Sequence, residues 1–248
     1  MRRSHSQAGV TLIEVTIAVT LLALLSTGML MALRVGLSAY SKTESKLMEN
    51  RRVAGAQRIL QQELEGLVPA YVECGGDQGG GGTRAVFFQG TPNSMWLVST
   101  FSLQQGWRGV PQILQIFAGG GELGGGRLLV NETAYTGAKG AGQYCSGTHT
   151  VSGSISRLPN LIPTGSGTGS FVLADNLAYC RFSYYGPGKT YQAPPEWSST
   201  WDSKGWPMAI RVEMAPAKGD PSRLQPISVT APIHIRRDPD KVFTDEKQ

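Results

Sequence analysis

The chain has 248 residues, enough for one domain with an appendage, and 23 Lys and Arg against 18 Asp and Glu give a net charge of +5 at pH 7. Charged residues make up 17% of the sequence, and it contains 32 Gly and 14 Pro. This composition excludes a disordered low-complexity chain, a coiled coil and a protein with several membrane spans. The basic residues are scattered along the chain, which favours a solvated surface over a nucleic-acid interface.

The first predicted element is an apolar helix over residues 10–33, which holds 24 residues and one charge, Glu14. About 20 apolar residues cross a bilayer, so this segment is long enough to do so. Arg2 and Arg3 precede it and Arg34 follows it. Arginines on the short N-terminal side favour a single pass with the N-terminus in the cytoplasm and the bulk of the chain outside it.

Three kinds of processing compete for this segment. A secretory signal peptide would be cleaved near residues 26–28 (Ser-Thr-Gly), a plain anchor would not be cleaved, and a third kind of leader is removed ahead of the apolar stretch. Glu14 discriminates among them. A carboxylate within a membrane-spanning helix costs at least about 2.5–3.5 kcal/mol and needs a partner, and neither a signal peptide nor an anchor has a use for one.

The short polar head 1–9, the Gly9–Val10 junction and the run VTLIEV closely resemble the N-terminal motif of type IV prepilins. The resemblance implies that a prepilin peptidase and N-methyltransferase of the inner membrane cleaves after Gly9 and methylates Val10. It also implies that Glu14 pairs with a free N-terminal amine during filament assembly. A buried ammonium and carboxylate offset each other's desolvation, which neither group does alone. Val10 departs from the phenylalanine that the family usually has there.

The helix is expected to continue far beyond the membrane. No proline occurs before Pro69, so one helix is predicted from Thr11 to Leu67, about 85 Å long at 1.5 Å per residue. Residues 34–68 form its amphipathic continuation. An apolar stripe at helical spacing predicts packing on the protein's own domain; it consists of Val53, Ala56, Leu60, Leu64 and Leu67.

Residues 69–235 are predicted to form a β-rich domain, which makes the fold α+β with antiparallel sheets against a long helix. The predicted strands are Ala85–Gln89, Ser94–Leu103, Gln112–Ala118, Arg127–Asn131, Phe171–Tyr185, Met208–Met214 and Ile227–Ile235. In the last two strands apolar and polar residues alternate, which indicates one buried face and one solvent-exposed face. Pro232 cannot donate to a ladder, so the last strand is predicted at an edge. The glycine runs Gly79–Gly82, Gly119–Gly126 and Gly165–Gly169 are predicted to be mobile loops, and the tail 236–248 to be flexible.

The C-terminal part most resembles the J-type minor pseudopilin of type II secretion. The resemblance rests on the aromatic segment 181–186 (RFSYYG), a loop with Trp197, Trp201 and Trp206, and the alternating segment 206–213 (WPMAIRVE). It implies two packed antiparallel sheets, a periplasmic domain, and other minor and major pseudopilins as partners at the tip of a pseudopilus. A minor pilin of a type IV pilus, acting in assembly priming, adhesion or DNA uptake, is the first alternative. A periplasmic binding module released by a signal peptide is the second.

No catalytic, cofactor or metal site is predicted, and the chain is interpreted as a non-enzymatic protein. The segment 186–190 (GPGKT) ends like a P-loop, but Ser183 stands where the first glycine belongs and 191–195 (YQAPP) cannot start the required helix. The three histidines lie far apart. Asp175 and Asp202 are the only candidates considered for calcium, and isolated loop carboxylates are usually only solvated.

Cys74, Cys145 and Cys180 are the only cysteines. An oxidising periplasm would let one pair bridge and leave one thiol over, and all three pairings are open. We favour Cys74 with Cys145 because both lie in glycine-rich loops that a tether would hold. Cys180 lies inside a predicted strand, as a core residue.

Overall fold

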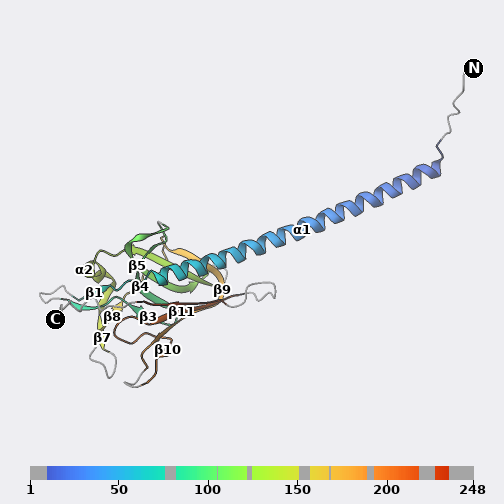
Figure 1. The fold of residues 1–248 in the computed structure, drawn as a ribbon. Coiled ribbons are helices and arrows are strands. Elements are labelled where there is room, and N and C mark those ends of the chain that lie inside the picture. The colour runs from blue at the N-terminus through green and yellow to red at the C-terminus, as the bar shows by residue number, and fades with distance from the viewer. Residues whose placement is uncertain are drawn as a thin grey trace, which may run out of the picture. The chain divides into compact units, whose positions relative to one another are not determined.

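The computed structural model of the chain divides into two units, Met1–Glu49 and Asn50–Gln248 (Figure 1). The residues described are 10–75, 82–104, 106–121, 125–150, 157–167, 169–188, 193–217 and 227–234, without the side chains of 45–54 and 107. The predicted leader 1–9 and tail 236–248 therefore lie outside the described residues.

A single helix, α1 (Leu12–Glu65), runs through the first unit and into the second. The prediction of one helix from Thr11 to Leu67 is confirmed to within two residues at its C-terminus. Residues 12–44 are apolar enough and long enough to cross a membrane. The most apolar part of this segment is not buried against the rest of the protein. The helix is uninterrupted because its sequence is rich in the helix-forming residues Leu, Ala and Met. It contains no proline, which would break the backbone hydrogen bonds of the helix.

The described residues of the second unit form one eight-stranded antiparallel sheet and two small sheets. In the large sheet the strand order is β12-β11-β9-β6-β5-β4-β3, and β10 pairs with β9. The bounds are β3 Gln89–Gly90, β4 Ser94–Ser102, β5 Trp107–Gly120, β6 Gly126–Ala134, β9 Phe171–Gly186, β10 Glu196–Ser198, β11 Ala209–Pro216 and β12 Ile227–Pro232. The α+β prediction is confirmed, and β12 lies at the edge that Pro232 predicted.

Each small sheet is a pair of antiparallel strands. One pair is β1 (Tyr71–Cys74) with β2 (Thr83–Val86), and the other is β7 (Cys145–Thr150) with β8 (Arg157–Leu161). A short helix α2 (Ala138–Ala141) and a 3₁₀ turn η1 (Gly142–Tyr144) precede β7. The expectation of two packed sheets is therefore wrong in number, because the large sheet is accompanied by two two-stranded sheets rather than by one equal partner.

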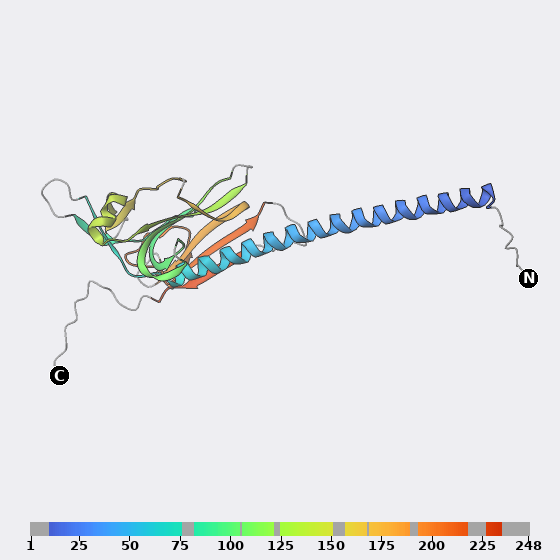
Figure 2. The same ribbon diagram turned by 90° about the horizontal axis from the view of Figure 1, so that it is seen from above.

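Two apolar clusters lie on opposite faces of the large sheet. Along β4, Met95 and Leu97 belong to the cluster that also contains Leu60 and Leu64 of α1, together with Ala56 and Leu67. The next residues along the strand, Trp96 and Val98, belong to a second cluster with residues of β1 and β2. Alternation along the strand therefore places the last turns of α1 on one face (Figure 2) and the small sheets on the other.

One strand prediction needs correction. The segment Ala85–Gln89 is not one strand, because β2 ends at Val86 and β3 begins at Gln89 in a different sheet. The two phenylalanines between them, Phe87 and Phe88, enter different clusters, so the chain changes sheets there. An aromatic run read only for β-propensity does not reveal such a corner.

The glycine run Gly119–Gly126 is also not wholly a loop. β5 continues to Gly120 and β6 begins at Gly126, and these two residues pair across the ladder. Glycine weakens a strand because it offers no side chain to pack, but the ladder needs only its backbone. At Gly119 a Cβ atom would lie 2.8 Å from Leu129 Cδ1, so the missing side chain makes room for a neighbour.

Aromatic rings occupy the space of absent side chains at two other glycines. A Cβ atom at Gly90 would lie 2.4 Å from the ring of Tyr184, and one at Gly186 would lie 2.4 Å from the ring of Trp201. Tyr184 is fully buried, and its hydroxyl donates to the Thr91 carbonyl at 2.9 Å. These contacts fix β3 and the loop after β10 against β9.

Candidate functional site

The N-terminal end of α1 carries the residues that the sequence singled out. Val10 is 70% exposed, and the carbonyl of Thr11 accepts from the N–H groups of Glu14 and Val15 at 3.1 and 3.3 Å. Glu14 therefore lies in the first turn of the helix. The unpaired N–H groups there give the helix end a partial positive charge, which favours a carboxylate. Gly9, the predicted cleavage position, lies outside the described residues.

Several polar side chains of the apolar segment are satisfied by the helix itself. Thr16 donates to the Ile13 carbonyl at 2.9 Å. Thr20 does the same to Ile17 at 2.9 Å and Thr27 to Ala23 at 2.7 Å. Hydrogen bonds within the helix suit a segment surrounded by hydrocarbon, because no water is available there to bond with a polar group.

Glu14 differs from these threonines. Its side chain is exposed, and its carboxylate has no hydrogen-bond or ionic partner among the residues that the structure describes. The apolar side chains around it are exposed as well, with Leu12 at 84% and Ile17 at 54%. A contiguous apolar surface of this kind marks a membrane or a protein contact. Within the described residues, the Glu14 carboxylate is therefore free to meet a partner at such a contact.

Comparison with known families agrees with this geometry. Residues 4–30 match the family described as the prokaryotic N-terminal methylation motif. The N-terminal segment therefore carries a motif of the kind found in type IV pilin-like proteins. The motif implies processing by prepilin peptidase and assembly with other pilins, and it is typical of a structural protein rather than an enzyme. No curated protein and no solved structure matches the chain.

The match places the predicted residues of this pilin-like N-terminus in one segment. Gly9, Val10 and Glu14 all fall within residues 4–30. The apolar helix that follows fits the membrane anchor of such a protein. The match does not extend to the β-rich domain, whose contribution has to be judged from its own geometry.

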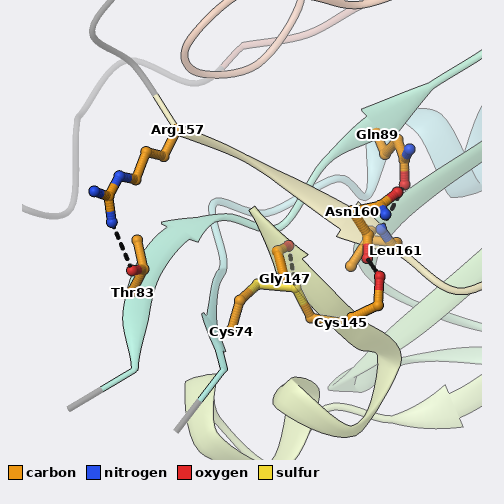
Figure 3. Close-up of a disulfide and its surroundings, with 9 residues drawn as sticks. Cys74, Thr83, Gln89, Cys145, Gly147, Arg157, Asn160 and Leu161 are labelled. Atoms are coloured by element: carbon orange, nitrogen blue, oxygen red, sulfur yellow. Dashed lines mark hydrogen bonds between the residues drawn. A yellow bond between two sulfur atoms is a disulfide. The ribbon is translucent and has the colours of Figure 1, made fainter. Parts of the chain in front are cut away.

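The structure joins Cys74 and Cys145 in a disulfide with a Cα–Cα distance of 5.4 Å and a sequence separation of 71. This is the pair that the sequence favoured. The bond connects the end of β1 to the start of β7 (Figure 3). Cys180 is free and buried in β9, and burial raises the pKa of its thiol to about 12.

Hydrogen bonds beside the disulfide attach the second small sheet to its neighbours. Arg157 on β8 donates to the Thr83 hydroxyl on β2 at 3.1 Å, and the Leu161 N–H donates to Gln89 Oε1 at 2.9 Å (Figure 3). The disulfide thus belongs to a corner in which β1, β2, β7 and β8 are fastened together. This corner covers the face of the large sheet opposite α1.

The described residues contain no group of three or more His, Cys, Asp and Glu able to hold a metal. Asp175, one of the two calcium candidates, pairs with Arg127 at 3.1 Å. Asp202, the other, accepts from the Thr200 hydroxyl at 3.3 Å. Lys189 and Thr190 of the P-loop-like segment lie outside the described residues.

A pocket of about 250 Å³ lies between β6 and the loop that precedes β9, with Trp96 and Tyr144 in its wall. The Asn131 amide donates to the Thr164 carbonyl at 2.9 Å and accepts from the Ser170 hydroxyl at 2.5 Å. These bonds hold the described part of the glycine loop that the sequence predicted to be mobile. Asn131 and the loop that it holds therefore both form part of the pocket wall.

One buried ionisable residue was missed by the sequence analysis. Glu63 on α1 has no exposed surface, and neither of its carboxylate oxygens has a hydrogen-bond partner. The sequence does place Glu63 on the buried face of the helix. Glu63 follows Leu60 by three residues and Ala56 by seven, which is the spacing of the apolar stripe. Its polar identity concealed that it belongs to the buried face.

Proposed function

We propose that this protein is a minor pseudopilin of a type II secretion system. Prepilin peptidase cleaves it after Gly9, Val10 becomes the N-methylated terminus, and residues 10–33 hold it in the inner membrane with its β-rich domain in the periplasm. It then assembles with other minor and major pseudopilins at the tip of a pseudopilus and acts in protein export. The observation that carries the proposal is the exposed Glu14 carboxylate within the methylation motif, which has no partner among the described residues.

The assembly step follows from the electrostatics of that carboxylate. An unpaired charge in hydrocarbon costs several kcal/mol, and a buried ion pair removes most of this cost. Cleavage after Gly9 creates a new α-amine four residues from Glu14 in each subunit. The amine of one subunit is therefore the cation best suited to the Glu14 carboxylate of its neighbour, and pairing them selects for the assembled state.

The geometry of the β-rich domain supports the J-type assignment. The segments that carry the resemblance lie side by side, since Ser183 of β9 pairs with Arg211 of β11 and Tyr185 pairs with Trp197 of β10. The Arg211 guanidinium lies 3.9 Å above the Trp197 ring, which is a cation–π contact. The aromatic strand, the tryptophan-containing loop and the alternating strand therefore form one structural unit.

Replacing Gly9 by Leu is expected to block processing, because the peptidase must accommodate the residue before the cut. Intact mass and N-terminal sequencing in the native host should show precursor that retains residues 1–9. Replacing Gly28 by Leu, within the competing signal-peptide site, should leave cleavage unchanged. A mature chain that begins near Met29 in the wild type would contradict the proposal and establish a released periplasmic protein.

Deleting the gene in its native host separates the two filament functions. We expect secreted enzymes to accumulate in the periplasm, with surface motility unaltered and export restored by the wild-type gene. Lost motility, adhesion or DNA uptake with normal secretion would instead assign the protein to a type IV pilus. Restoration by a Glu14→Ala variant at wild-type level would contradict assembly through Glu14 in either system.

A further inference from the structure

Glu63 lies at the junction between α1 and the large sheet. Its neighbours on the buried stripe, Leu60 and Leu64, are 0% and 1% exposed. The neighbouring ionisable residues of the same helix, Arg58 and Glu65, are exposed and belong to its outer face. Glu63 is thus the one carboxyl that α1 carries into the core among its described side chains.

Hydrogen bonds join the end of α1 directly to β4. The Ser99 hydroxyl on β4 donates to the Glu63 main-chain carbonyl at 3.0 Å, and the Thr100 N–H donates to the Gly66 carbonyl at 2.9 Å. A Cβ atom at Gly66 would lie 2.6 Å from Ser99 Oγ. The end of α1 and the residue after it therefore contact β4 directly, and the Glu63 side chain beside this contact has no exposed surface.

Among the described groups that act on the Glu63 carboxyl, only the Ser99 hydroxyl favours a negative charge, and burial outweighs it. No described Lys, Arg or His pairs with its carboxylate, and both of its oxygens lack hydrogen-bond partners. The Ser99 hydroxyl on β4 is directed to the main chain. The ionisable group that acts on Glu63 from β6 is Glu132, which is another acid.

Glu132 is in a different environment from Glu63. Its carboxylate accepts from the Ser102 hydroxyl and from the N–H groups of Leu103 and Gln104, the latter two at 2.9 and 3.2 Å. These three donors hold the Glu132 carboxylate in place on the sheet. Its negative charge opposes ionisation of Glu63.

We propose that Glu63 is a proton-dependent latch, which holds the last turns of α1 on the sheet when it is protonated and releases them when it ionises. Ionisation would leave a bare carboxylate in the apolar core, so the charged form is accommodated only when the turn around Glu63 opens to water. The proposal concerns the folding of this domain and stands whether or not the protein enters a pseudopilus.

The raised pKa of Glu63 determines how the stability of this junction depends on pH. Burial, opposed by the Ser99 hydroxyl and assisted by the charge of Glu132, raises the pKa of Glu63 from 4.5 to about 8. A raised pKa in the folded state means that the folded state binds the proton more tightly than the opened one. The stabilisation is therefore complete below pH 4.5, declines as the pH rises, and is lost above about pH 8.

The test is amide hydrogen exchange on the full-length protein in detergent micelles, followed over residues 60–66 at several pH values. After correction for intrinsic exchange, we expect the protection of these amides to fall by up to about tenfold per pH unit between the two pKa values. Glu63→Gln, which cannot ionise, should abolish this slope. Glu65→Gln, an exposed carboxyl of the same turn, should retain it.

A second variant keeps the proposal testable if Glu63→Gln does not fold. Glu132→Gln removes the opposing charge, so the midpoint of the protection change should move to lower pH while the slope remains. The latch would be disproved by a wild-type protection that does not vary with pH. An equal slope in Glu63→Gln, or an unmoved midpoint in Glu132→Gln, would also overturn it.

Discussion

Replacing Glu14 by Ala should leave processing after Gly9 intact and reduce incorporation into the filament by a factor of about 10²–10³. Removing one partner of a buried ion pair costs about 3–5 kcal/mol, because the other charge is left uncompensated. In the assembly that we propose, the uncompensated group is the N-terminal amine of a neighbouring subunit. Each 1.4 kcal/mol lost corresponds to about a tenfold weaker association.

The variant should reside in the membrane at least as well as the wild type, since it no longer carries an unpaired carboxylate into hydrocarbon. This distinguishes a defect of assembly from a defect of insertion. The measurement is the amount of the protein that co-purifies with other pseudopilins after cross-linking, relative to the amount in the membrane. Glu44→Gln, at the far end of the apolar segment, is the matched control and should assemble normally. Unchanged co-purification of Glu14→Ala would remove the role that we assign to this residue.

Loss of the disulfide is the second large effect that we expect. Replacing both Cys74 and Cys145 by Ser should lower the free energy of unfolding by about 4 kcal/mol, because the bond closes a long loop and restricts the unfolded chain. For a domain of this size the midpoint of thermal unfolding should fall by roughly 10 °C. Chemical and thermal unfolding of the full-length protein in micelles under oxidising conditions measure both quantities.

Reduction offers an independent check on the same bond. A reductant should bring the wild type to the stability of the double variant and leave the variant unchanged. Cys180→Ala is the control, since this thiol is buried and unbonded. It should cost only the small cavity that it leaves and should respond to the reductant as the wild type does. If Cys180→Ala abolished that response, the pairing of Cys74 with Cys145 would be wrong.

The parts of the fold that depend on local sequence could be predicted. The long helix follows from the absence of proline before Pro69 and from the apolar run at its start. The strands β11 and β12 follow from their alternation, and Pro232 indicated the edge. The methylation motif is a short contiguous pattern, so Glu14 stands out without any knowledge of the β-rich domain.

The parts that depend on contacts between distant segments could not be predicted. β7 (CSGTHT) and β8 (RLPNL) contain residues that local propensity assigns to loops, and they become strands because they pair with each other. β1 follows a proline closely and pairs with β2 across residues outside the described ranges. The number of sheets was wrong for this reason.

Glu63 shows the same limit at the level of one side chain. Its place on the helical stripe was readable, but a glutamate at such a position is ordinarily solvated. Its burial depends on packing against segments from elsewhere in the chain, such as β4, whose Ser99 hydroxyl donates to the Glu63 carbonyl. The charge state of Glu63 is therefore a property of the assembled domain, and local sequence carries no direct sign of it.

The position of β12 at the edge of the large sheet has a consequence for proteins that accumulate in a confined compartment. A free strand edge exposes backbone groups that can pair with another copy and seed aggregation. β12 is only six residues long, and Pro232 removes one of its donors. A second copy therefore finds few positions at which to continue the ladder. The same proline that identifies the edge thus limits unwanted strand exchange between neighbouring molecules.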